Sequence, residues 1–168
     1  DKCAKVIGLP YPGGPVIDKK AKLGNNKAFV FNKPKIKELD YSFSGLKTSF
    51  LYFIRDEIKK DNDFVKKNMN DLCASIQYTI IDILMEKLVR ASKQTGIKQI
   101  AVAGGVSANS GLRDALTQQA KINHWETYIP EFNFTTDNAA MIGITGYYKY
   151  QNKEFASQDI APIARFAY

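Results

Sequence analysis

The sequence is poor in the residues that build metal centres and disulfide frameworks. Its 168 residues include a single histidine, His124, and two cysteines, Cys3 and Cys73, which lie 70 positions apart with no CxxC spacing. A structural zinc site needs about four such ligands, so a site made within this chain is not expected. Two isolated thiols are typical of reduced, cytoplasmic proteins, and both are expected to be small core residues.

Long apolar runs are also missing. No stretch approaches the ~18 consecutive apolar residues of a membrane span, and no basic segment followed by an apolar one opens the chain. Hydrophobic residues nevertheless make up 45% of the sequence and aromatic residues 12%, which is enough to build a core. The length and composition therefore predict one globular domain, or one half of a two-domain protein, with no membrane span.

Acidic residues are too few to balance the basic ones. Lysine and arginine number 24 against 17 acidic residues, a formal charge of +7. The whole excess lies in residues 1–70, which carry 15 basic and 8 acidic side chains, whereas residues 71–168 carry 9 of each. A one-sided basic surface attracts polyanions, which makes nucleic acid a candidate partner. A solvated lysine-rich surface would give the same composition.

Helical periodicities dominate the chain. Leucine or isoleucine recurs every four residues from Leu72 to Leu88, which predicts a long helix over about 71–92 that Gly96 ends. Shorter helices are expected over 16–23 and 44–59, the second capped by a serine. A short extended piece is expected over 28–31.

The most informative segment is residues 97–109. Residues 100–103 predict a short buried strand, Gly104 and Gly105 follow it, and helical spacing resumes after Asn109. A strand, a glycine turn and a helix bring free backbone N–H groups to the carboxyl end of the strand, where glycine lets a flat or anionic ligand approach. Nucleotide binding is the functional hypothesis, and a tight strand-to-helix connection is the structural alternative.

A second short strand, residues 127–129, leads to Thr136 and Asp137. Thr136 is a credible N-cap, which would put Asp137 in the first turn of a helix, where the helix dipole favours a carboxylate. Asp137 would also lie at the same sheet edge as Asn109, where it could be a metal ligand or a catalytic carboxylate. The residues alone favour the capping interpretation and leave the other open.

Four motifs stand in order along the chain. They are DKCAK at 1–5 with YPGGP at 11–15, DYSFSGLKT at 40–48, AGGVSAN at 103–109 and TDNAAMI at 136–142. In this order they resemble the tRNA adenosine threonylcarbamoyltransferase family, formerly called O-sialoglycoprotein endopeptidases or glycoproteases. The resemblance covers nearly the entire chain.

The resemblance implies an α/β fold, namely a helix-rich, RNase H-like lobe of the actin, Hsp70 and sugar-kinase (ASKHA) superfamily. Residues 1–168 would form the carboxyl-terminal lobe of a two-lobe protein with its active site in the cleft between the lobes. The amino-terminal lobe, with a paired-histidine metal motif and a glycine-rich substrate loop, would lie outside this chain. Asp1 opens directly into an amphipathic pattern without an initiator methionine, which also indicates a piece of a longer protein.

The resemblance further implies transfer of a threonylcarbamoyl group from threonylcarbamoyl-AMP to the exocyclic amine of the tRNA adenosine 3′ of the anticodon. The matching positions for binding the adenylate are Asp1, Gly14, Gly104, Gly105 and Asn109. Asp137 would be a ligand of one divalent metal ion, either iron or an ion of the zinc or magnesium type. A carboxylate such as Asp1 suits a ribose diol, and an amide such as Asn109 suits the neutral edge of adenine.

The family's partners are tRNA and, in bacteria, a paralogous protein and an ATPase, which implies a cytoplasmic location and no membrane. Lys33, Lys35 and Lys37 are the candidate tRNA phosphate contacts. The isolated chain is expected to lack transferase activity, because half of the cleft would be missing.

Other functions stay open. A nucleotide-binding or partner-recruiting half-module without catalysis is the main alternative. A metal-dependent glycoprotease is weaker, because the chain has neither a histidine pair nor an HExxH motif. A kinase-like activity would be recognised by phosphotransfer from ATP, which is not expected.

Overall fold

The computed structural model describes residues 1–34, 36–161 and 163. Its helices are α1 (Lys2–Val6), α2 (Gly13–Ala21), α3 (Ser44–Lys60), α4 (Phe64–Lys67), α5 (Met69–Thr95), α6 (Ser110–Asn123) and α7 (Ala139–Gln151). Strands β1 (Gln99–Ala101) and β2 (Glu126–Tyr128) pair in parallel, and the 3-10 turns η1 (Gly105–Ala108) and η2 (Phe132–Phe134) lie beyond them. A helix-rich chain with a small parallel sheet is compatible with the predicted α/β class.

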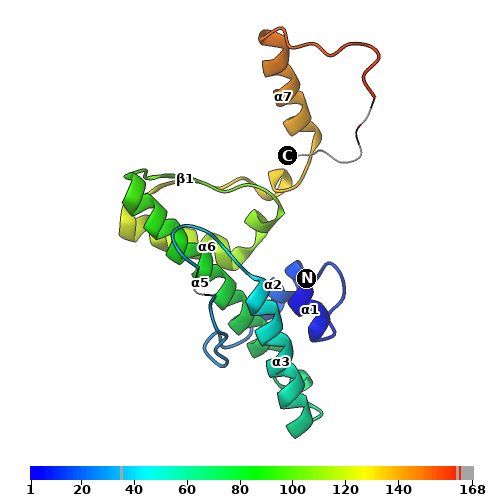
Figure 1. Cartoon of the computed structure of the whole chain (residues 1–168), viewed down its shortest axis with the longest axis vertical. Coiled ribbons are helices and arrows are strands. Elements are labelled where there is room, and N and C mark those ends of the chain that lie inside the picture. Colours follow the sequence, from blue (N-terminus) through cyan, green and yellow to red (C-terminus); the bar gives the residue numbers. More distant parts are fainter. Residues whose placement is uncertain (35, 162, 164–168) are drawn as a thin grey trace.

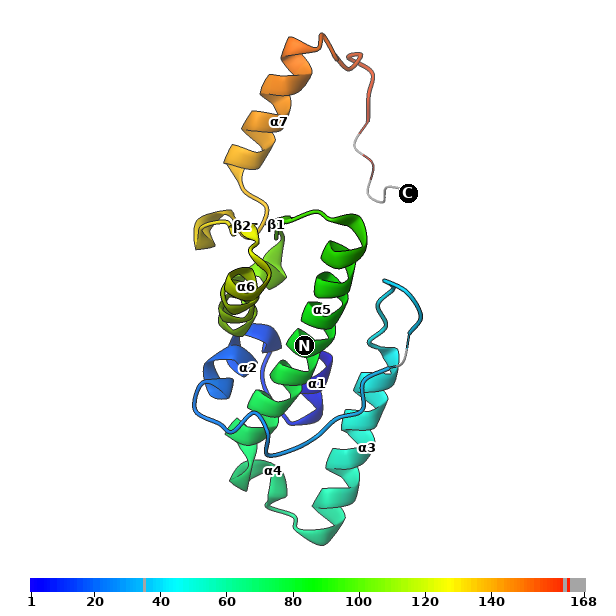
Figure 2. The ribbon, with the colours of Figure 1, turned by 90° about the vertical axis from the view of Figure 1, so that its left-hand side faces the viewer.

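Helix α5 is the central helix of the molecule. Helix α3 lies along one side of it, and α2 and α6 lie along the other (Figures 1 and 2). Its bounds, Met69–Thr95, enclose the predicted helix, and Leu72 and Ile76 of the predicted apolar stripe are fully buried. The helix ends at Gly96, whose left-handed φ of 72° costs glycine little. The prediction of this helix and of its end is therefore confirmed.

The buried side chains form two clusters along α5. The first joins α1, α2, α3 and the amino-terminal half of α5, and it contains Cys73, with Cys3 packed against it. The second joins the carboxyl-terminal half of α5 to the sheet and α6 around Leu116 and Trp125. The indole N–H of Trp125 donates a 2.8 Å hydrogen bond to Ser92 Oγ. Cys73 is therefore a core residue, as expected, whereas Cys3 is only half-buried at the edge of this cluster.

Several short segments differ from the expectation. Residues 28–31 form no strand, although the aromatic rings of Phe29 and Phe31 pack against α3. The N-cap position of α3 is occupied by Phe43 and not by a serine. In β1 only Ile100 is buried, because a two-stranded sheet leaves both neighbouring residues exposed. Short elements are fixed by such tertiary surroundings more than by their own sequence.

The predicted cap of the last helix was wrong. The N-cap of α7 is Asn138, whose Oδ1 accepts a 3.1 Å hydrogen bond from the backbone N–H of Met141. Asparagine caps a helix at least as well as threonine, so Asn138 takes the role expected of Thr136. Asp137 therefore precedes the helix and does not lie in its first turn.

Helix α7 projects away from the rest of the molecule (Figures 1 and 2). None of its described residues is buried, and its apolar side chains, among them Ile142, Tyr147 and Tyr150, are exposed. No helix within the described residues combines the length and the apolarity that crossing a membrane requires.

Candidate nucleotide-binding site

A cavity of about 650 Å³ lies between α1, α2, α5 and the starts of α3 and α6. Seven of its sixteen lining residues are isoleucines and leucines of α2, α3, α5 and α6. The charged or polar side chains in its lining are Asp1, Lys2, Lys47, Gln77 and Asn109. A largely apolar cavity of this size with a few polar groups is typical of a site for a small organic molecule.

Two of the predicted binding residues meet on one wall of this cavity. Asp1 Oδ1 accepts a 2.9 Å hydrogen bond from the backbone N–H of Gly14. This N–H lies in the first turn of α2, where backbone N–H groups have no acceptor within the helix. A carboxylate accepts several hydrogen bonds, and Oδ2 of Asp1 makes none to the part of the chain that the structure describes. This oxygen can therefore accept from a bound hydroxyl group.

Asn109 lies on a neighbouring wall and has two partners within the protein. Its Oδ1 accepts a 2.9 Å hydrogen bond from Leu112 N, which caps α6, and its Nδ2 donates a 2.8 Å bond to Gln77 Oε1. A primary amide offers two N–H donors and two acceptor lone pairs. One of each is used, so Asn109 keeps one donor and one acceptor, which is the pattern that an adenine edge pairs with.

Three residues that sequence reasoning missed hold Asn109 in place. Asp18 Oδ1 accepts from Gln77 Nε2 at 3.1 Å and from Ser110 Oγ at 2.9 Å, and Asp18 Oδ2 accepts from Ser110 N at 3.1 Å. Gly111 allows this approach, because a Cβ there would lie 2.8 Å from Gln77 Nε2. One available signal was the spacing of Asp18 four residues after Gly14, on the same face of a helix.

The glycine turn lies at the end of the sheet and outside the cavity lining that the structure describes. Gly104 has a φ of 78°, in the region that favours glycine. A Cβ at Gly105 would lie 3.9 Å from Thr136 Cγ2, so this turn approaches the segment that carries Asp137. The structure thus brings Asp1, Gly14 and Asn109 to one cavity, which Gly104, Gly105 and Asp137 do not line.

The described residues do not by themselves make a metal site. Asp137 is exposed, and no three His, Cys, Asp or Glu side chains come together anywhere in residues 1–34, 36–161 and 163. His124 is exposed at the carboxyl end of α6. One carboxylate is too few donors to hold a divalent ion, so Asp137 could supply only one ligand of such a site.

Neither thiol is poised for covalent chemistry. Cys3 lines the cavity, and burial raises the pKa of its thiol above the ordinary value. Burial likewise raises the pKa of Cys73 to about 11. Because the thiolate is the nucleophilic form, the raised pKa values make both thiols less reactive at neutral pH than a free cysteine.

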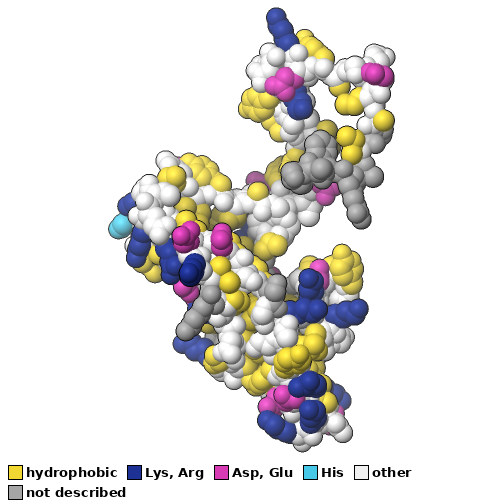
Figure 3. All heavy atoms as spheres, in the orientation of Figure 1, with side chains coloured by type: hydrophobic (Ala, Val, Ile, Leu, Met, Phe, Trp, Pro, Cys, Tyr) yellow, Lys and Arg dark blue, Asp and Glu magenta, His cyan; other side chains and the backbone are white. Residues whose placement is uncertain are grey.

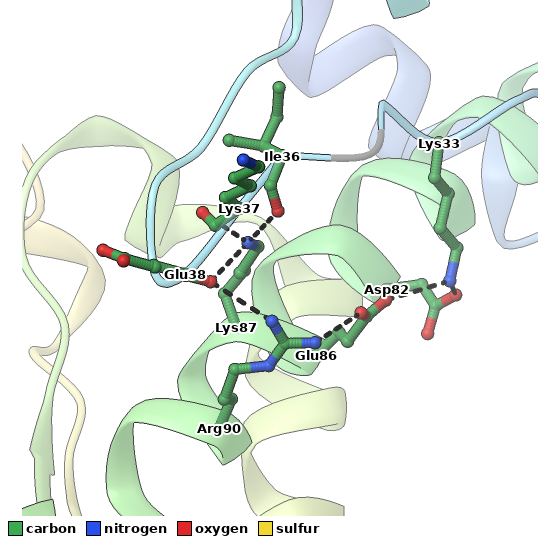
Figure 4. A network of polar contacts seen from close by, with 8 residues as sticks. All are labelled: Lys33, Ile36, Lys37, Glu38, Asp82, Glu86, Lys87 and Arg90. Atoms are coloured by element: carbon green, nitrogen blue, oxygen red, sulfur yellow. Dashed lines mark hydrogen bonds and ion pairs between the residues drawn. The ribbon is translucent and has the colours of Figure 1, made fainter. Parts of the chain in front are cut away.

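The three lysines proposed for RNA contact differ in their surroundings. Lys33 forms an ion pair with Asp82 and lies 3.7 Å from a carboxylate oxygen of Glu86 (Figure 4). The hydrogen bond to Asp82 raises the pKa of Lys33, so this lysine stays charged. Lys37 is exposed and makes no ion pair within the described residues, and Lys35 lies outside them. Other lysines and arginines gather over α1 and the far end of α3 (Figure 3).

Comparison with known proteins gives a consistent result. A family model described as tRNA N6-adenosine threonylcarbamoyltransferase matches residues 1–144. Proteins of that name from Christiangramia forsetii and Phocaeicola vulgatus are 56% and 60% identical to this chain, over 100% and 98% of it. A Porphyromonas gingivalis relative of the same name is 58% identical over 98% of the chain. The chain spans about half the length of these relatives, with 48–49% of each covered.

Proposed function

The chain belongs to the tRNA N6-adenosine threonylcarbamoyltransferase family, and on that premise we propose that it is the carboxyl-terminal, ASKHA-type lobe of such an enzyme. The whole enzyme would move a threonylcarbamoyl group from threonylcarbamoyl-AMP to the exocyclic amine of the tRNA adenosine 3′ of the anticodon. The observation that supports this proposal is the cavity lined by Asp1, Gly14 and Asn109. In this proposal the cavity holds the adenosine part of the adenylate.

The groups around the cavity suit an adenylate. The free oxygen of Asp1 would accept from the ribose hydroxyls, the remaining amide donor and acceptor of Asn109 would pair with the adenine edge, and the apolar wall would flank the base. Lys2 and Lys47, also in the lining, would offset the phosphate charge.

The proposed reaction requires no covalent intermediate with these residues. The acceptor amine forms a bond to the carbamoyl carbon and loses a proton, while the bond from that carbon to the phosphate oxygen breaks and AMP leaves with the electron pair. Positive charge near the leaving phosphate favours this step, as Lys2 and Lys47 would provide. The chain on its own is proposed to be inactive, because the acyl group and the acceptor must also be held in line by residues outside it.

Three further elements remain proposals for the longer protein. A divalent metal ion, iron or one of the zinc or magnesium type, would take one ligand from Asp137. A paralogous protein and an ATPase would be its partners in bacteria. The tRNA substrate would place the enzyme in the cytoplasm.

The adenosine site can be tested by calorimetric titration of the chain with AMP, beside the variant Asn109→Ser. Serine keeps the N-cap of α6 and removes the amide that would pair with adenine. AMP is expected to bind the parent chain, and its affinity is expected to fall about fivefold or more in the variant, the effect of losing a hydrogen bond in a partly buried site.

The control for this titration is the melting temperature, which should fall only slightly, because serine keeps the cap and loses the one hydrogen bond to Gln77. Heat from AMP that is unchanged in Asn109→Ser would contradict the assigned role of Asn109. No heat from either protein would contradict an adenosine site formed by this chain.

The RNA surface is tested by changing Lys33, Lys35 and Lys37 together to glutamate. If they bind phosphates, tRNA affinity is expected to fall, and the slope of log K against log salt to decrease by about 1 for each phosphate that is no longer neutralised. A matched control changes Lys93, Lys98 and Lys121 to glutamate, which alters the net charge equally. Equal losses of affinity in both variants would mean a non-specific charge effect, and an unchanged slope in the first would place the tRNA surface elsewhere.

A further inference from the structure

The loop before α3 is anchored to the side of α5 by one buried ammonium group. Lys87 is 7% exposed, and its Nζ donates hydrogen bonds to three consecutive backbone carbonyls, of Ile36 at 2.8 Å, Lys37 at 3.5 Å and Glu38 at 2.6 Å (Figure 4). An ammonium group has three donors, so all of them are used. Arg90 adds a 3.3 Å bond to the same carbonyl of Glu38.

The anchored carbonyl belongs to a strained residue. Glu38 has a φ of 50°, in the left-handed region that glutamate rarely adopts. Such a conformation persists only where its surroundings hold it, and here two cations bind its carbonyl oxygen. Five residues, 39–43, separate this anchor from the first residue of α3. Side chains of α3 are buried in the core, so the helix holds the other end of these five residues. The segment 39–43 is therefore held at both ends.

That segment presents two parallel aromatic rings beside the cavity. The ring centroids of Tyr41 and Phe43 are 6.4 Å apart and their planes differ by 7°. The two residues are 47% and 37% exposed, and Phe43 lines the same cavity as Asp1 and Asn109. Exposed, parallel rings on an anchored loop contribute little to a core, and they offer flat apolar surface to a ligand.

We propose that Tyr41 and Phe43 form a stacking platform for the unpaired acceptor base of the RNA, next to the adenylate site. The inference rests on the proposed function and names the residues that would receive the second substrate. A base taken out of a nucleic-acid stack loses its neighbours, and aromatic side chains replace them. The lysines and arginines that gather over α1 (Figure 3) provide the charge complementarity that favours RNA phosphates over an apolar protein partner. Lys87 is then a positioning residue.

The test measures binding of two anticodon stem–loop RNAs to the chain. One carries 2-aminopurine at the acceptor position, whose fluorescence falls on stacking, and the other is abasic there. Phe43→Ala and Tyr41→Ala are each expected to weaken binding of the first RNA about tenfold and to restore its fluorescence. Neither should change the affinity for the abasic RNA. Tyr41→Phe should behave as the parent, because it keeps the ring.

The positioning role is tested by Lys87→Met, which removes three of the four hydrogen bonds that anchor the loop and touches no ligand. It should weaken binding of the 2-aminopurine RNA as Phe43→Ala does and leave the abasic RNA unaffected. Since Tyr41 and Phe43 are exposed, their variants remain informative even if Lys87→Met fails to fold.

Equal losses of affinity for both RNAs, or no loss in Phe43→Ala and Tyr41→Ala, would overturn the platform. The AMP titration separates this result from failure of the proposed function. If the parent chain binds AMP but the substitutions leave its affinity for the RNA unchanged, the chain has the adenosine site without the stacking platform. A parent chain that binds neither AMP nor the RNA overturns both.

Discussion

Replacing Gly24 with alanine is expected to destabilise the chain by about 3 kcal/mol or more. A Cβ at this position would overlap the backbone carbonyl of Asn70 and lie 2.7 Å from the backbone nitrogen of Asp71. These atoms belong to the first turn of α5 and cannot swing aside as the end of a side chain can. The adjoining residue, Asn25, donates from its backbone to Asp71 Oδ1 at 2.7 Å, so moving the loop would also break this hydrogen bond. Urea denaturation measures the change in the free energy of unfolding.

Gly45→Ala is the matched control. Nothing lies within 4 Å of a Cβ at Gly45, which is exposed in the first turn of α3. Alanine loses less backbone entropy than glycine in a helix, so this variant is expected to gain up to about 1 kcal/mol. A Gly24→Ala variant as stable as the parent would mean that the loop after α2 does not lie on α5 as described.

Replacing Asp18 with alanine is expected to cost stability and AMP binding together. The carboxylate accepts three hydrogen bonds, from Gln77 and from the backbone and side chain of Ser110. Their loss leaves these donors unpaired in a half-buried site, with an expected cost of about 2–3 kcal/mol. Gln77 also accepts a hydrogen bond from the side-chain amide of Asn109, so a displaced Gln77 would displace Asn109 as well. The affinity for AMP is therefore expected to fall about tenfold. Urea denaturation and calorimetry measure the two effects.

Asp114→Ala provides the comparison for Asp18→Ala. Asp114 is an exposed acid on α6, and in the described part of the chain its side chain makes no hydrogen bond or ion pair. Its variant should stay within about 0.5 kcal/mol of the parent. A loss of stability in Asp18→Ala without any loss of AMP affinity would restrict Asp18 to a structural role.

The sequence predicted those features that repeat over many residues. The four-residue repeat of α5 extends across several helical turns, so it outweighs local exceptions. The end of the helix was predictable because glycine adopts the left-handed backbone that Gly96 has there. Single-residue signals were weaker. Thr136 and Asn138 are both good N-caps, and the sequence does not say which of them adopts the extended backbone that capping requires.

The contacts that build the cavity could not be predicted from local pattern. Asp18 binds residues 59 and 92 positions away, and no periodicity links α2 to the start of α6. Asn109 was assigned to ligand binding from the family motif, whereas its role as the cap of α6 is seen only when the helix start is known. The burial of Lys87 likewise depends on carbonyls about 50 positions earlier in the chain.

The exposure of α7 affects how a thermal unfolding curve of this chain is interpreted. A helix of 13 residues with none of its described side chains buried gains little from tertiary packing, and isolated helices of that length are marginal in water. Its opening is therefore not coupled to that of the two cores, and the chain behaves as at least two cooperative units. The single tryptophan, Trp125, belongs to the second core. Its fluorescence reports the melting of that core, while α7 can fray at lower temperature without altering the signal.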